Sequence, residues 1–444
     1  MPGYADRLTR KARQWLVLVV RECPERKHDV LWAAFTGVAV FLITFARDPS
    51  AWNSIWAEDG AVFLTASVDQ GFGSLFHFWA GYINTVPRVG ALIAAALPLS
   101  IAPAVMTTYA VAIVGICGAT VEALSGAFIE GRWARVGLGL CFGFLPAVRV
   151  ESIANMNNLQ FFLVAVSFWP LIAIPRTRRG RSGSVVLLVA TASSTIIGLV
   201  LLPLGLLRVF DRRSRLPAAM FLFVQVLHGL IVLIAHPTRQ IGGPISFSAV
   251  EQTFVTNVLA GQFFGGPFYA LRDRSLTLLA IEIVAVAAVV LLIVYRPRGV
   301  SGQLILAGGA LVLSAVTYVV ETKTQGAWAR YAVAPALFML YGIAIVADIA
   351  SRLKLRARRP HLAGTRGRQP SRLAWPLAGV MALAVVLSWG FSYNVEPYRD
   401  GGPRWSASYA AARVGCREGQ RTEQLPILPV GWAVTLPCSA IASG

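Results

Sequence analysis

The chain has 444 residues, of which 56% are hydrophobic and 14% are charged, and its mean hydropathy is +0.62. This composition is far more apolar than that of soluble domains and excludes an ordinary soluble protein. The formal charge of +19 would suggest nucleic acid as a partner of a soluble chain. Here the basic residues stand between apolar runs and lack the aromatic residues that stack on bases, so we do not expect nucleic-acid binding.

Apolar runs of about 17 to 25 residues, each long enough to cross a membrane core of about 30 Å, recur along the chain. We therefore predict an all-α, polytopic transmembrane protein with roughly 10 to 13 membrane helices, including short or re-entrant ones. The alternating pattern of an outer-membrane barrel does not occur. No cleavable signal peptide is expected, because residues 1–28 are basic and amphipathic.

The basic residues predict the orientation of the chain in the cytoplasmic membrane. Under the positive-inside rule, the basic N-terminus at 1–29 is cytoplasmic, and a membrane domain follows at 30–391. The long first loop at 47–88 and the tail at 392–444 then lie on the outer side. We expect anionic lipid headgroups to contact the basic clusters of the cytoplasmic side. Those between the spans are at 176–181, 208–215 and 351–372.

In chain order, full spans are expected at 30–46, 104–129, 136–150, 157–174, 217–235, 276–295, 302–320, 331–349 and 374–391. The run 89–100 contains Pro98, and a full crossing there would place 176–181 outside. We therefore interpret it as a short re-entrant or interfacial helix. Segment 184–207 has basic clusters at both ends but the length of one span. We expect it to fold back at the Ser/Thr cluster 193–195.

The stretch "NSIWAEDGAVFLTAS" places two adjacent carboxylates, Glu58 and Asp59, in the first outer loop. A carboxylate can take a proton from an alcohol or hold a divalent metal such as Mg²⁺ or Mn²⁺. We predict Asp59 as the base and Glu58 as its orienting partner or a metal ligand, with the order open to reversal. The competing interpretation is that the pair caps a helix. Trp56 and Phe63 are expected to anchor this loop at the headgroup level.

Other polar residues of the predicted outer face could bind a substrate. Arg and Lys near the bilayer surface can hold a lipid-linked phosphate. Asparagines at the ends of spans can bind polar ligands or cap helices. The candidates are Arg88, Asn155, Asn158, Lys323, Arg330 and Tyr331.

Motifs for ATP coupling, zinc hydrolysis and the nucleophile elbow do not occur in the chain. Two of the five cysteines, Cys416 and Cys438, belong to the outer tail. Because that compartment is oxidising, we predict a disulfide between them.

The layout of the chain resembles the GT-C superfamily of integral-membrane glycosyltransferases. The resemblance covers about residues 30–391 and rests on "WAEDG" in a long first outer loop, on paired short helices mid-chain and on "RY" at a late span. It implies a polyprenyl-phosphate sugar as donor, an acid at Glu58 or Asp59 as base or metal ligand, and Lys323 or Arg330 on the donor phosphate. "GYINTVPR" and "LPVGWAVTLPC" also resemble an actinobacterial-type branch of membrane proteins.

The chain departs from the superfamily in two respects: its acids are adjacent rather than spaced, and no large outer domain follows. Acceptor and metal dependence therefore stay open. The leading hypothesis is sugar transfer at the outer face of the cytoplasmic membrane. A transporter or flippase is the alternative, for which Glu122 and Glu282 within spans would be functional carboxylates. A third possibility is a structural or assembly protein whose outer charges are only solvated.

Overall fold

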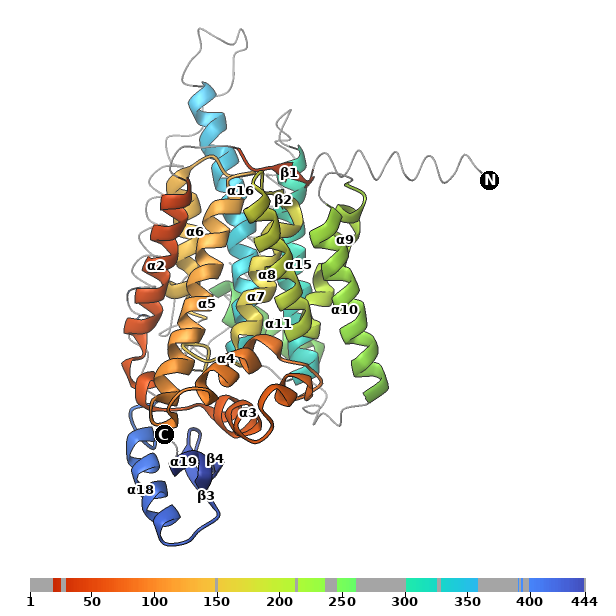
Figure 1. Ribbon diagram of the computed structural model, residues 1–444. Helices are drawn as coiled ribbons and strands as arrows, with labels where there is room; N and C mark the ends of the chain where they lie inside the picture. Colours follow the sequence, from red (N-terminus) through yellow and green to blue (C-terminus); the bar gives the residue numbers. More distant parts are fainter. Residues whose placement is uncertain are drawn as a thin grey trace.

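The computed structural model describes residues 19–24, 29–147, 151–211, 215–235, 246–260, 301–325, 329–357 and 399–442, together with residues 390 and 393. This part of the chain is mostly helical, as predicted (Figure 1). Five helices in it are long and apolar enough to cross a membrane: Asp29–Arg47, Leu99–Ser125, Arg215–Ile234, Gly302–Thr322 and Arg330–Ile349. The predicted span at 276–295 lies outside the described residues. So do the span at 374–391, apart from residue 390, and most of the basic N-terminus.

The first helices of the bundle pack through glycines. Helix α2 (Asp29–Arg47) lies against α5 (Ala102–Ser125) and α6 (Arg132–Phe144). A Cβ on Gly37 would meet the carbonyl oxygen of Gly115 at 3.1 Å, and one on Gly118 would meet that of Gly139 at 2.9 Å. Small residues let membrane helices approach closely. The full spans predicted at 136–150 and 157–174 are corrected: α6 has 13 residues and α7 (Leu159–Ile172) has 14, fewer than a crossing needs. Helix α7 lies inside the bundle, with every residue buried.

The run around 89–100 is a short helix, as expected. Helix α4 (Thr85–Ala95) has 11 residues, too few to cross a membrane, and a 3-10 turn, η4 (Leu99–Ile101), leads from it into α5. The start of α4 is held by the break in segment 184–207. Thr85 donates its hydroxyl to the carbonyl of Ser193, and the Val86 N–H donates to the Ser194 hydroxyl.

Segment 184–207 breaks where its sequence predicts. Helix α8 (Arg178–Ser194) ends at Thr195, whose backbone is extended, and η5 (Ile196–Leu201) and α9 (Leu202–Val209) follow. The Thr195 hydroxyl accepts the N–H of Ile197 and so caps the next turn. One expectation is corrected: the basic cluster 176–181 is not a loop throughout, because Thr177 caps α8 and helix begins at Arg178.

The later helices are α10 (Arg215–Ala235), α11 (Phe247–Phe254), the π-helix η6 (Val255–Ala260), α15 (Ser301–Gln325), the 3-10 turn η7 (Ala329–Ala332) and α16 (Val333–Ala357). Helix α15 continues to Gln325, beyond the predicted end of its span at residue 320. Glu321 and Lys323 therefore belong to a helix and not to an outer loop. The side chain of Lys323 lies outside the described part of the structure.

The two ends of the bundle carry different elements (Figure 1). At one end, which we call the basic end, β1 (Arg21–Glu22) pairs in parallel with β2 (Ala173–Ile174) just before α8 begins. Here Arg352 forms ion pairs with Glu130 and Asp348. The opposite end, the site end, carries the first loop, folded as η1 (Pro49–Asn53), the π-helix η2 (Asp59–Leu64), α3 (Thr65–Gln70) and η3 (Gly71–Phe76).

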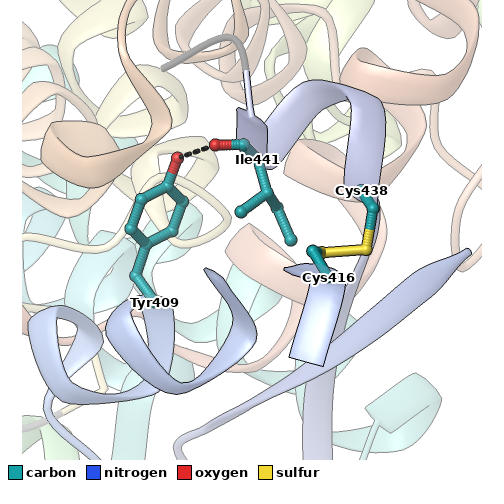
Figure 2. The surroundings of a disulfide bond; sticks show 4 residues. All are labelled: Tyr409, Cys416, Cys438 and Ile441. Atoms are coloured by element: carbon teal, nitrogen blue, oxygen red, sulfur yellow. Dashed lines mark hydrogen bonds between the residues drawn. A yellow bond between two sulfur atoms is a disulfide. The ribbon is translucent and has the colours of Figure 1, made fainter. Parts of the chain in front are cut away.

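The predicted tail is a folded unit at the site end. This C-terminal unit, residues 399–442, consists of α18 (Trp405–Arg417), an antiparallel hairpin of β3 (Thr422–Ile427) and β4 (Trp432–Pro437), and α19 (Cys438–Ala442). The predicted disulfide between Cys416 and Cys438 is present and joins α18 to α19 (Figure 2). In the same unit the Tyr409 hydroxyl donates to the Ile441 carbonyl.

Candidate active site

Asp59 joins the first loop to the loop before α7. One of its carboxylate oxygens accepts the main-chain N–H of Met156 at 2.8 Å, and the other accepts that of Asn157 at 2.9 Å. The side chain is only 4% exposed. Burial raises the pKa of Asp59 to about 7, although the two N–H groups and Arg399 act in the opposite direction. Asp59 thus fixes the segment 151–158, which we call the asparagine loop.

Strained backbone flanks this contact on both sides. Ala57 has a φ of 33° and Ala154 a φ of 51°, a region that side chains other than glycine rarely adopt. Each such residue costs on the order of 1–3 kcal/mol, and such residues concentrate at functional sites. A hydrogen bond from the Ala57 N–H to the Leu428 carbonyl holds the first of them in place.

Glu58 has a different environment from its neighbour. Its side chain is half-buried, and it accepts no hydrogen bond from the part of the chain that the structure describes. Its charge acts on Asp59 and on Arg330. Of the two adjacent acids, Glu58 is therefore the one whose carboxylate a ligand could approach.

Arg330 brings a third segment to this point. Its guanidinium forms an ion pair with Glu151 of the asparagine loop at 3.1 Å and donates to the Tyr331 hydroxyl at 3.3 Å. It also lies 5.2 Å from the centre of the Tyr331 ring. The acidic pair, the asparagine loop and the turn η7 before α16 thus converge, although they are far apart in sequence.

The two candidate asparagines hold their own loop. The Asn155 side-chain oxygen accepts the Asn158 N–H at 3.2 Å, and the Asn158 amide donates to the Glu151 carbonyl. Both side chains are buried. The remaining amide nitrogen of Asn155 and the remaining oxygen of Asn158 have no hydrogen-bond partner in the described part of the chain. Their role in substrate binding stays a prediction.

Arg88 is buried beside the helix that Asp59 begins. Its Nε donates to the Ile83 carbonyl at 2.9 Å, and its guanidinium lies 5.3 Å from the centre of the Phe63 ring. Burial alone lowers the pKa of Arg88 to about 10. No described residue forms a hydrogen bond with its Nη1.

The expected headgroup anchors are corrected. Trp56 and Phe63 are both buried, because Trp56 packs against Leu428 of the C-terminal unit and Phe63 belongs to the main core. Aromatic residues that are exposed in the first loop come later in it: Phe72, Phe76, Phe78 and Trp79.

Sequence reasoning missed Arg399 of the C-terminal unit. This buried guanidinium forms an ion pair with Asp48 at 3.1 Å, donates to the Ile153 carbonyl at 3.2 Å and lies 5.7 Å from the centre of the Trp56 ring. It therefore connects three segments: Asp48 just after α2, Trp56 of the first loop, and the asparagine loop. A lone arginine in a polar tail gives no sequence signal for such a role.

The described residues do not form a complete metal site. No group of three His, Cys, Asp or Glu side chains gathers among them. Both oxygens of Asp59 accept main-chain N–H groups, and Glu151 is paired with Arg330. This donor set does not fit a divalent ion held by Glu58 and Asp59 together, so we derive no step through a metal.

Glu122, which could have favoured a transporter, belongs to a buried ion network. Arg135 lies 3.6 Å from Glu122 and 3.5 Å from Asp29, toward the basic end of the bundle. A buried carboxylate next to a buried arginine has a structural explanation. Glu282 lies outside the described residues.

No protein-family model matches the chain, and no curated protein matches it.

Proposed function

We propose that this protein is a membrane glycosyltransferase, which moves a sugar from a polyprenyl-phosphate donor to an acceptor at the outer face of the cytoplasmic membrane. One observation carries the proposal: the Glu58 carboxylate, with no hydrogen-bond donor on it from the described residues, lies within electrostatic range of the Arg330 guanidinium. A base for an acceptor hydroxyl and a cation for a leaving phosphate are the two groups that such a transfer needs.

The roles of the adjacent acids follow from their environments. Glu58 takes the proton of the acceptor hydroxyl, because the oxygens of Asp59 are already bound to main-chain N–H groups. The acceptor oxygen then forms a bond to the anomeric carbon of the sugar. The bond from that carbon to the phosphate oxygen breaks, and its electron pair leaves with the polyprenyl phosphate. This is the reversed order of the two acids that the sequence left open.

Arg330 stabilises the charge on the departing phosphate. A guanidinium can hold two phosphate oxygens at once, which a lysine cannot do. Glu151 forms an ion pair with this guanidinium. The phosphate competes with Glu151 for it, and Tyr331 keeps the guanidinium oriented.

The proposed orientation rests on the separation of charge between the two ends of the bundle. The basic clusters at the starts of α8 and α10 favour a cytoplasmic basic end. The disulfide of the C-terminal unit favours an oxidising compartment at the site end. Both point to a cytoplasmic N-terminus and an extracytoplasmic C-terminus.

The test is transfer from radiolabelled polyprenyl-phosphate sugars by the purified protein in liposomes. Glu58→Gln should lower turnover by about 10²- to 10⁴-fold, the usual contribution of a general base. Glu130→Gln is the matched control, because Glu130 lies at the basic end, and it should keep full turnover. Movement of intact lipid-linked sugar across the bilayer without transfer would favour the flippase alternative.

A further inference from the structure

Arg88 differs from other buried arginines of this protein. Arg135 faces Glu122 at 3.6 Å, and Arg399 faces Asp48 at 3.1 Å. Arg88 is 1% exposed, yet no carboxylate of the described residues pairs with it or acts on its charge. A buried charge without a counter-charge strongly disfavours folding. A chain that keeps such a charge at its site end gains something other than stability from it.

The guanidinium of Arg88 keeps one buried donor, Nη1, without an acceptor among the described residues, whereas its Nε donates to the Ile83 carbonyl. A guanidinium is a donor suited to the oxygens of an anion.

We infer that Arg88 is a binding residue for a phosphoryl group. The inference rests on the proposed function, to which it adds a second phosphate contact besides Arg330. Arg88 lies in the first turn of α4, where the helix dipole also favours an anion.

The segment before α4 contacts Arg88 and contains strained backbone. The Ile83 carbonyl accepts the Arg88 Nε–H. Ala80 has a φ of 51° and Asn84 a φ of 56°. Such conformations persist only while surrounding contacts hold them, and they concentrate at functional sites.

The experiment compares apparent melting temperatures of the full-length protein in detergent, with and without phosphoryl probes. The probes are inorganic phosphate, a water-soluble isoprenyl phosphate and a short-chain phosphatidylglycerol. A ligand that binds the folded state raises the melting temperature. Arg88→Met is the test variant. Arg413→Met is the matched control, because Arg413 is an exposed arginine of the C-terminal unit.

Without a probe, Arg88→Met should melt at or above the wild-type temperature, because an apolar side chain replaces an uncompensated buried charge. Arg399→Met should melt lower, since it leaves Asp48 unpaired. With a probe, wild type and Arg413→Met should both gain melting temperature, and Arg88→Met should not. A response to the isoprenyl phosphate alone would identify a lipid-linked donor. A response to phosphate or to phosphatidylglycerol would identify the free ion or a phospholipid headgroup as the source.

A lower melting temperature for Arg88→Met without a probe would make Arg88 structural and overturn the inference. A wild-type response that persists in Arg88→Met would overturn it too, and so would a wild type that responds to no probe. The proposed sugar transfer is tested separately. The protein could show a melting-temperature response that depends on Arg88 and yet no sugar transfer. That result would support the anion site and contradict the proposed function.

Discussion

The carboxylate of Asp59 accepts the main-chain N–H of Met156 at 2.8 Å, across 97 residues of sequence. With the neighbouring bond to Asn157, it fixes the asparagine loop against the first loop of the site end. The position of Glu58 relative to Glu151 and Arg330 depends on this contact, so it should be possible to disturb the site from a residue that touches no substrate.

The first prediction concerns Asp59→Asn. A carboxamide offers one acceptor oxygen in place of two. Its NH₂ group, which is a donor, would therefore face one of the two main-chain N–H groups, which is a donor too. We expect a loss of about 1–3 kcal/mol in stability, the cost of one unsatisfied buried group. Thermal unfolding measures this loss, and hydrogen exchange at 151–158 should increase. Asp69→Asn, an exposed change in α3, should alter neither, and equal behaviour of both variants would contradict the anchoring role.

The second prediction concerns pH. Burial raises the pKa of Asp59 from 3.8 to about 7, so the folded protein binds this proton more tightly than the unfolded chain does. The stabilisation is therefore complete below about pH 4 and is lost as the pH rises through about 7. The slope can reach about 1.4 kcal/mol per pH unit. Unfolding measured from pH 4 to 8 should show this slope in wild type and a flatter profile in Asp59→Asn. Equal pH slopes of stability in wild type and Asp59→Asn would show that Asp59 is not the origin of the slope.

The third prediction tests the attachment of the C-terminal unit. Arg399→Met leaves Asp48 without its ion-pair partner. The Asp48 side chain is 11% exposed and, among the described residues, keeps only the Ser50 hydroxyl as a donor. Removing one partner of a buried pair typically costs about 3–5 kcal/mol, and the partial exposure of Asp48 places this variant at the lower end of that range. Asp48→Asn should also destabilise, and the double variant should lose less than the sum of the two, because the ion pair is lost only once. Urea unfolding of the four proteins in mild detergent gives the coupling energy. Additive losses would mean that the ion pair at 3.1 Å contributes little.

The fourth prediction concerns Arg330→Lys. Lysine cannot hold two phosphate oxygens in a planar fork or keep the guanidinium contact with the Tyr331 ring. We expect donor KM to rise at least about tenfold. The melting temperature should change little, because partly exposed ion pairs contribute about 1 kcal/mol or less. Steady-state kinetics with varied donor measure the effect, and an unchanged KM would leave Arg88 as the phosphate contact.

The fifth prediction is the orientation. Arg179→Cys places a thiol at the exposed start of α8, and Val430→Cys places one in the C-terminal unit, where Val430 is 92% exposed. Cys23, Cys117 and Cys141 are replaced by serine to remove background. A membrane-impermeant maleimide should label position 430 in intact cells and position 179 only after permeabilisation. The reverse pattern would put the site end in the cytoplasm.

Local sequence determined the elements of this protein. Runs of apolar residues predicted the helices that are long enough to span, because burial in lipid requires a fixed length of apolar chain. The Ser/Thr cluster predicted the break at Thr195, since hydroxyl groups compete for backbone hydrogen bonds. The two cysteines of the tail predicted the disulfide. Each of these features depends on residues close together in sequence or on the chemistry of one residue type.

Only the tertiary structure decided how these elements meet. Their adjacency in the chain marked Glu58 and Asp59 as a pair. Which of the two acids is buried depends on the loop at Met156 and Asn157. The contact of Arg399 with the Ile153 carbonyl spans 246 residues. The burial of Trp56 depends on Leu428, which comes from the folded C-terminal unit. Hydropathy and periodicity describe how a residue relates to its near neighbours, whereas burial of a charge depends on which distant segments pack around it.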